Sequence, residues 1–166
     1  MTVGLLITEM TPEDWPAVRT IYEEGIETKQ ATFETAVPSW SEWNAAKRTD
    51  CRLVARLEDQ VIGWAALNPV SCRTVYAGVA EVGIYIAKAN RGQGVGQLLL
   101  ETLIEASEEA GIWTLQASVF PENTSSTHLF HSCGFCQVGY RERIANHEGR
   151  WRNTLLLERR SDNVGV

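Results

Sequence analysis

The sequence predicts one domain of the mixed α/β (α+β) class, in which helices cover the faces of a single sheet. The first observation is the expected order of elements, β-α-α-β-β-β-α-β-α-β-β, which lacks the strict alternation of a doubly wound parallel sheet. The second is an apolar strand over residues 79–86 that leads into a glycine-rich turn and then a long helix. We expect this domain to span residues 1–160, followed by a frayed tail over residues 161–166.

Each element has a local signal in the sequence. Apolar runs bounded by turn-forming residues predict strands over residues 4–8, 53–57, 61–67, 79–86, 113–119, 138–144 and 150–158. Helical spacing and capping residues predict four helices: one from Thr11 to about Gly25, one opened by a Ser39–Glu42 capping box, one from Val95 to Ala110, and a short one from Asn123 to Gly134. The hairpin of the second and third strands should be broken by Asn68-Pro69.

The strand over residues 79–86 has two different faces. Alternation places Ala80, Val82, Ile84 and Ile86 on one face and Val79, Glu81, Gly83 and Tyr85 on the other. A face with a glutamate, a glycine and a tyrosine is not a core pattern. Gly83 favours a bulge or the close approach of a ligand. This face is therefore the first candidate for chemistry.

Composition excludes several classes of function. The formal net charge is -6, which argues against a nucleic-acid-binding surface and leaves Lys88 and Arg91 as a local basic spot. No apolar run is long enough to span a membrane and no signal peptide is evident, so we expect a cytoplasmic protein. The four cysteines are then expected to be reduced thiols.

The glycine-rich turn, Gly92-Gln93-Gly94-Val95-Gly96, is typical of a site for phosphate groups. Glycines allow backbone N–H groups to point inward, and the start of the following helix adds partial positive charge. The turn is not a Walker A loop, because no Lys-Ser or Lys-Thr follows it, and its spacing is not that of the G-x-G-x-x-G dinucleotide motif.

The run Arg91-Gly92-Gln93-Gly94-Val95-Gly96 resembles the R-x-x-G-x-G signature of the GNAT superfamily of acetyl-CoA-dependent N-acetyltransferases. Asn123 and Gly134-Phe135 match that family's next helix. The resemblance implies a mostly antiparallel sheet of six to seven strands with about four helices on its faces. It also implies a bulge in the strand that precedes the turn.

Further motifs are similar to the phosphinothricin acetyltransferase branch of this family. They are Ala31-Thr32-Phe33-Glu34, Ser71-x-Arg73-x-x-Tyr76, Glu81, Glu122-Asn123-Thr124-Ser125-Ser126 and Gly149-Arg150-Trp151-Arg152-Asn153. The run from Ala31 to Trp43 looks closest to the arsinothricin-acetylating relatives. The resemblance therefore implies a small amino-acid-like substrate and a homodimer, whereas the composition implies no nucleic-acid or membrane partner.

The resemblance also assigns residues to roles. Acetyl-CoA, as cosubstrate and without a metal, would be bound by Ile84, Tyr85, Ile86, Arg91, Gly92, Gln93, Gly94, Val95, Gly96, Gln97, Asn123, Ser126 and Ser132. The acceptor would contact Phe33, Glu34, Arg73, Val75, Tyr76 and Glu81. Glu81 is the candidate general base. Many relatives have a tyrosine at the position of Phe130 that protonates the CoA sulfur, so here Tyr85, a water or no acid serves.

Other functions stay open at this point. The acceptor could be a protein N-terminus, a lysine or a polyamine, although Arg73 favours an acidic small molecule. The absence of the usual tyrosine also allows a non-catalytic acyl-CoA-binding sensor. His128, His131, Cys133 and Cys136 could bind zinc or perform redox chemistry, but a helix stop at Gly134 explains that segment better.

Overall fold

The computed structural model describes residues 3–166 as a seven-stranded sheet with helices on both faces. The strands are β1 (Leu5–Glu9), β2 (Leu53–Leu57), β3 (Gln60–Pro69), β4 (Val79–Ile86), β5 (Thr114–Val119), β6 (Cys136–His147) and β7 (Arg150–Arg160). The helices are α1 (Trp15–Glu27), α2 (Trp40–Ala46), α3 (Val95–Glu109) and α4 (Thr124–Ser132), with short 3-10 turns η1 (Pro12–Asp14), η2 (Thr74–Tyr76) and η3 (Lys88–Asn90). The predicted class and element order are confirmed.

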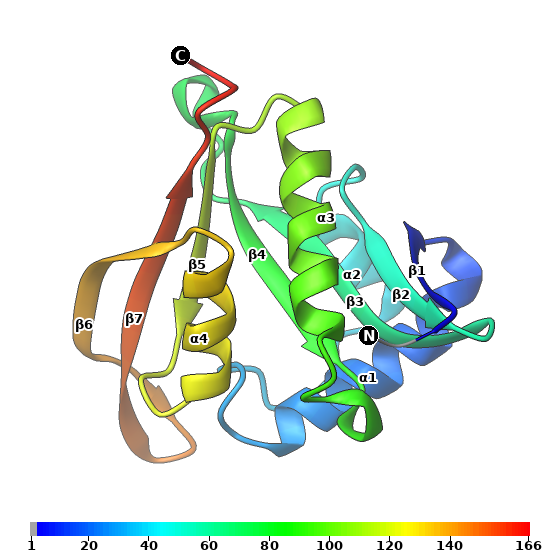
Figure 1. The fold of residues 1–166 in the computed structure, drawn as a ribbon. Coiled ribbons are helices and arrows are strands. Elements are labelled where there is room, and N and C mark those ends of the chain that lie inside the picture. The colour runs from blue at the N-terminus through cyan, green and yellow to red at the C-terminus, as the bar shows by residue number, and fades with distance from the viewer. Residues whose placement is uncertain (1–2) are drawn as a thin grey trace.

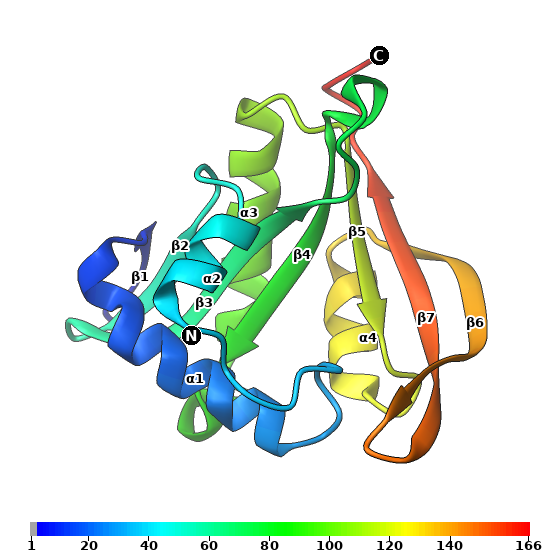
Figure 2. The same ribbon diagram turned by 180° about the vertical axis from the view of Figure 1, so that it is seen from behind.

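The sheet is almost entirely antiparallel. Its strand order is β1-β2-β3-β4-β5-β7-β6, and β4–β5 is the one parallel pair among the described strands. Helices α3 and α4 lie on one face (Figure 1), and α1 and α2 lie on the other (Figure 2). The segment between α1 and α2 runs over the face covered by these two helices and extends towards α4 (Figure 2).

The sheet opens between β4 and β5. These strands pair only from Val79 with Thr114 to Glu81 with Gln116, and they then diverge (Figure 1). On its other side β4 keeps an unbroken register with β3, from Pro69 opposite Ala80 to Gly63 opposite Ile86. The expected bulge at Gly83 is therefore absent from the β3–β4 ladder. The opening is made by the loss of the β5 partner, which leaves one edge of β4 without a strand beyond Glu81.

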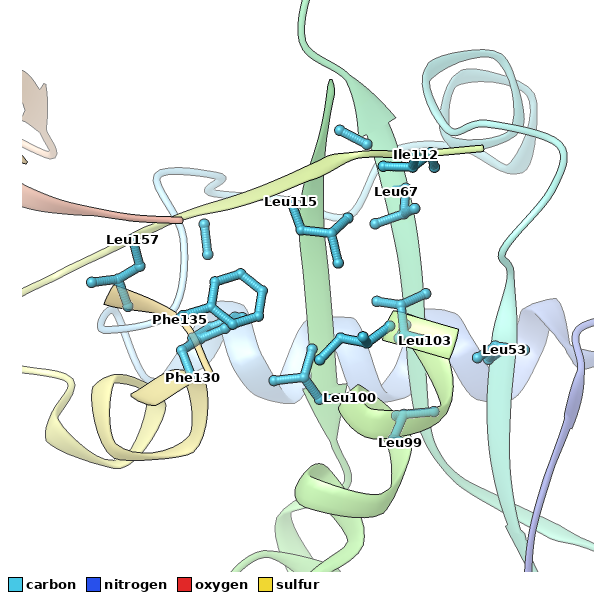
Figure 3. Packing of buried hydrophobic residues seen from close by; sticks show 14 of the residues in the cluster. Leu53, Leu67, Leu99, Leu100, Leu103, Ile112, Leu115, Phe130, Phe135 and Leu157 are labelled. Atoms are coloured by element: carbon cyan, nitrogen blue, oxygen red, sulfur yellow. The ribbon is translucent and has the colours of Figure 1, made fainter. Parts of the chain in front are cut away.

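One apolar core holds the two sides of this opening together. Leu99, Leu100 and Leu103 of α3 pack with Leu115 of β5 and Leu157 of β7 (Figure 3). Phe130 and Phe135 close the same core beside α4, with their ring centroids 4.9 Å apart. A second cluster of Tyr22, Trp43 and Trp64 lies under α1 and α2. The strands on the two sides of the opening are therefore joined by one continuous core.

The ends of several elements differ from the predicted ones. The capping box of α2 is present, with Ser39 accepting from the Glu42 N–H. Strand β3 continues through Asn68-Pro69 instead of ending before it, because both residues pair with β4. Strand β6 is longer than predicted and accommodates two register shifts. No helix within residues 3–166 has the length and apolar character needed to cross a bilayer.

The C-terminal residues, expected to fray, are bound to the end of α3. Glu108 forms an ion pair with Arg159 at 3.1 Å and accepts hydrogen bonds from Ser161 and Asn163. Arg160 donates to the carbonyls of residues 164 and 165. Glu108 thus anchors this segment, because the end of β7 runs alongside the end of α3.

Candidate active site

The glycine-rich turn presents the start of α3 to the opening in the sheet. Gly92 and Gly94 have φ values of +73° and +82°, which L-residues with a side chain rarely adopt, and Gly94 is the N-cap of α3. No side chain caps this helix, so its first N–H groups are free to bind an anion. Arg91 lies beside the turn and donates from Nε to the Ile86 carbonyl at 3.2 Å. The turn thus has the geometry of a phosphate site.

A groove of about 500 Å³ extends from this turn along β4 to α4. Most of the predicted cofactor residues line it, namely Ile84, Tyr85, Ile86, Arg91, Gly92, Gly94, Gly96, Gln97, Asn123, Ser126 and Ser132. The remaining lining residues, which sequence reasoning missed, are Gly25, Thr28, Gln30, Ala31, Asn90, Ser125, His128 and Leu129. The structure therefore brings the strand, the turn and the helix of the predicted site together.

Two predicted cofactor residues point elsewhere. The Val95 side chain is buried with Ala55 and Ile62, because the first turn of α3 packs on the sheet. The Gln93 side chain donates to the Ala89 carbonyl at 3.3 Å. Neither residue lines the groove.

A second cavity, of about 330 Å³, lies on the α1–α2 side of β4. The predicted residues Phe33, Glu34, Glu81 and Tyr85 line it. Its other lining residues are Tyr22, Ala31, Thr32, Lys47, Asn68, Val82, Gly83, Ser118, Phe120 and Thr154. Ala31 and Tyr85 line both cavities, so the two spaces meet at a shared wall.

Glu81 sits at the point where β4 and β5 part. Its Oε1 atom accepts from Gln116 Nε2 at 3.2 Å and from Ser118 Oγ at 3.4 Å, both on β5. Its Oε2 atom accepts no hydrogen bond from residues 3–166. One oxygen is thus held by the neighbouring strand and the other is available to a ligand in the second cavity.

Tyr85 is held by aromatic stacking. Its ring lies on Trp64 and on Tyr22, each with ring centroids 4.9 Å apart. Burial raises the pKa of Tyr85, with smaller contributions from Tyr22 and Glu34, and a hydrogen bond with Thr32 opposes the shift. Burial likewise raises the pKa of Tyr22 to about 12. Tyr85 is therefore a weaker acid than an exposed tyrosine, and it lines both cavities.

The loop after α1 is tied to the opposite half of the sheet. Asn123 accepts from the Ser126 N–H as the cap of α4, and its Nδ2 donates to the Gln30 carbonyl at 3.0 Å. Arg152 of β7, which is only 4% exposed, donates to the Lys29 carbonyl at 3.0 Å and to Gln30 Oε1 at 2.9 Å. These bonds position the segment that separates the two cavities.

Lys47, which sequence reasoning missed, supplies a cation to the second cavity. Its Nζ donates to Asn68 Oδ1 at 2.6 Å and lies 5.8 Å from the centroid of the Trp64 ring. Burial lowers the pKa of Lys47, while the charges of Glu81 and Glu34 favour its ammonium form. Asn68, the hydrogen-bond partner of Lys47, lies opposite Glu81 in the β3–β4 ladder. This register brings Lys47 and Glu81 to the same cavity.

The predicted acceptor residues Arg73, Val75 and Tyr76 line neither cavity. They are exposed on and beside η2, where the Arg73 guanidinium lies 5.7 Å from the centroid of the Tyr76 ring. The reason is topological. The segment η2 precedes Val79, at the end of β4 that still pairs with β5, whereas the opening lies at the other end (Figure 2).

The residues around Gly134 end α4. Gly134 has a φ of +89°, and the Phe135 N–H donates to the Phe130 carbonyl at 3.0 Å, which ends α4. Phe130 is 3% exposed and lies in the core, so it offers no proton donor to either cavity. Burial raises the pKa of the Cys133 thiol. Within residues 3–166 no three His, Cys, Asp or Glu side chains are grouped as a metal site.

Comparisons with known proteins agree with this geometry. A sequence model of the acetyltransferase (GNAT) family matches residues 9–135. A phosphinothricin N-acetyltransferase from Alcaligenes faecalis is 38% identical over 154 residues, which are 89% of this chain and 78% of that protein. An L-methionine sulfoximine/L-methionine sulfone acetyltransferase from Pseudomonas aeruginosa is 24% identical over 151 residues, which are 87% of this chain and 88% of that protein.

A solved structure has the same fold. It is a GNAT superfamily phosphinothricin acetyltransferase from Sinorhizobium meliloti in complex with AcCoA, with a TM-score of 0.88 and 26% identity. The similarity covers 98% of this chain and 91% of that chain. The sheet, the glycine-rich turn and these relatives together show that the chain belongs to the acetyltransferase (GNAT) family.

Proposed function

We propose that the chain transfers an acetyl group from acetyl-CoA to the α-amine of a small amino-acid analogue, of the phosphinothricin, arsinothricin or methionine sulfoximine type. The observation that carries this proposal is the shared wall. One cavity has an anion-binding turn, the other has a carboxylate, and both reach Ala31 and Tyr85. A thioester entering from one side and an amine from the other would meet there, as direct transfer requires.

The groove suits acetyl-CoA as the cosubstrate. The start of α3 and Arg91 would bind its pyrophosphate. Beyond Glu81, the edge of β4 has no strand partner, so its backbone groups are available to the extended pantetheine arm. The acetyl carbonyl would then lie beside the backbone of Tyr85 and Ile86, where an N–H group stabilises the oxyanion.

Glu81 is the proposed general base. The neutral amine attacks the carbonyl carbon, the new C–N bond forms, and the C–S bond breaks. The amine loses its proton to Glu81, directly or through a water, and the sulfur takes a proton from Tyr85 or from a water. A thiol has a pKa of about 8.5, so its thiolate is a tolerable leaving group even without a strong acid.

The size of the second cavity supports a small acceptor. A volume of about 330 Å³ is at the small end of ligand pockets. Phe33, whose ring meets that of Phe120 edge-on with centroids 4.9 Å apart, closes one wall. Its lining includes the carboxylates of Glu34 and Glu81 and the ammonium of Lys47. These charges match a molecule that carries both an amine and an acid group.

A thiol-release assay tests the proposal. The protein would be supplied with acetyl-CoA and with phosphinothricin, L-methionine sulfoximine, spermidine, a lysine peptide or a peptide with a free N-terminal alanine. We expect CoA release with the amino-acid analogues at least about tenfold faster than with the amines and peptides. Preference for a peptide or polyamine would contradict the proposed acceptor. Tight CoA binding without release for any acceptor would identify a sensor instead.

A further inference from the structure

Lys47 lies in the acceptor cavity at a defined position relative to Glu81. A Cβ atom built on Gly83 would be 3.7 Å from Lys47 Nζ, so the ammonium stands over Gly83. Gly83 is two residues after Glu81 on the same face of β4. Two residues along a strand advance about 7 Å, so the ammonium lies roughly one such step along β4 from the backbone of Glu81.

The position of Lys47 is fixed by its surroundings. Its own N–H donates to the Trp43 carbonyl at the end of α2, and the next N–H, of Arg48, donates to the Leu67 carbonyl of β3. Asn68 accepts from Lys47 Nζ and donates to the Ala46 carbonyl at 3.2 Å. The backbone hydrogen bonds of residues 47 and 48 thus fix the position from which the Lys47 side chain enters the cavity.

The charge of Lys47 is not neutralised by an ion pair within the described residues, 3–166. Its one hydrogen-bond acceptor there is the neutral Asn68 amide. No other Lys, Arg or His of that range lines the cavity. A half-buried ammonium with spare donors gains most from an anion that enters beside it.

We propose that Lys47 binds the α-carboxylate of the acceptor and thereby selects 2-amino acids over amines. This inference rests on the proposed function and assigns an acid-binding role to Lys47, which lines the cavity, whereas Arg73 does not. The distance along β4 suits an amine and a carboxylate on one carbon, with a hydrogen bond at each end. The amine then faces Glu81 and the side chain of the amino acid extends towards Phe33.

Binding to the CoA-loaded protein tests this assignment without requiring turnover. Titration calorimetry would compare L-methionine sulfoximine with its α-carboxamide, which has the same shape and no negative charge on the α-carbon group. The variants are Lys47→Met, which keeps the aliphatic stem between Trp43 and Trp64, and Lys47→Arg, which keeps the charge. Arg19→Met, on the exposed face of α1, is the control for loss of one positive charge.

We expect Lys47→Met to weaken binding of the acid by about 10- to 100-fold and binding of the carboxamide by less than about threefold. Lys47→Arg should retain the preference for the acid, and Arg19→Met should match the wild type. Equal losses for both ligands, or no preference in the wild type, would overturn the assignment. Failure of turnover alone would count against the proposed function and would leave this binding result interpretable.

Discussion

At the scale of single residues, two hydrogen bonds hold the Glu81 side chain in one orientation. Its Oε1 atom is held by Gln116 and Ser118, and both come from the strand that departs at this point. The carboxylate therefore keeps one orientation while its other oxygen faces the acceptor side. A glutamine has the same shape and can still accept the same two hydrogen bonds, but it cannot take a proton.

We therefore expect Glu81→Gln to lower kcat by about 100- to 10,000-fold, the usual contribution of a general base. The KM for acetyl-CoA should change little, because Glu81 does not line the groove. Steady-state kinetics with both substrates varied would measure the split. Glu105→Gln, exposed on α3, is the matched control. A Glu81→Gln enzyme with wild-type kcat would show that Glu81 is not the base.

At the scale of elements, the loop after α1 depends on a buried charge from β7. Arg152 donates two hydrogen bonds to residues 29 and 30 and lies 3.9 Å from the centroid of the Phe120 ring. Its guanidinium also pairs with Glu122 at 3.6 Å. Because Gln30 and Ala31 line the groove, Arg152 shapes this wall together with Asn123, the N-cap of α4.

We expect Arg152→Met to lower the free energy of unfolding by about 2 kcal/mol, the usual cost of losing hydrogen bonds from a charged donor. The KM values of both substrates should rise together, because the wall is shared. Urea denaturation and steady-state kinetics would measure the two effects. Arg150→Met is the control, since Arg150 pairs with the same Glu122 but is 67% exposed. Equal effects of both substitutions would contradict a special role for the buried arginine.

Local patterns predicted the elements and the face of β4 that lines the second cavity, but they missed Lys47 and Arg152. The strand over residues 79–86 and the helix that follows the glycine-rich turn depend on neighbouring residues, so periodicity and capping revealed both. Lys47 and Arg152 reach the site through contacts with residues 21 and more than 120 positions away in the chain. Arg73 was assigned to the acceptor by motif resemblance, and no local signal shows which end of β4 opens.

At the scale of the whole molecule, the outer strand of the sheet carries unusual apolar exposure. Strand β6 is an edge strand, and Val138, Tyr140 and Ile144 on it are each at least half exposed. Trp151, on the adjacent β7, is 60% exposed. Edge strands with exposed apolar side chains pair readily with another chain. Together with the family resemblance, this favours a homodimer formed through the β6–β7 hairpin.

We expect the protein to have the mass of two chains in size-exclusion chromatography with light scattering. The double variant Val138→Asp and Trp151→Asp should shift it to the mass of one chain, because two buried carboxylates per subunit would lack partners. Leu6→Asp tests the opposite edge of the sheet, where Leu6 is 62% exposed, and should leave the mass unchanged. A monomeric wild-type protein would refute the dimer.

The two cavities beside β4 also bear on the kinetic order of the proposed reaction. Each has its own set of lining residues, and only Ala31 and Tyr85 are common to both. Neither substrate must leave before the other can bind, and no cysteine within residues 3–166 lines either space to hold an acetyl group between steps. From the divergence of two strands, a feature of the sheet alone, we therefore expect a sequential reaction through a ternary complex, with no covalent acetyl-cysteine stage.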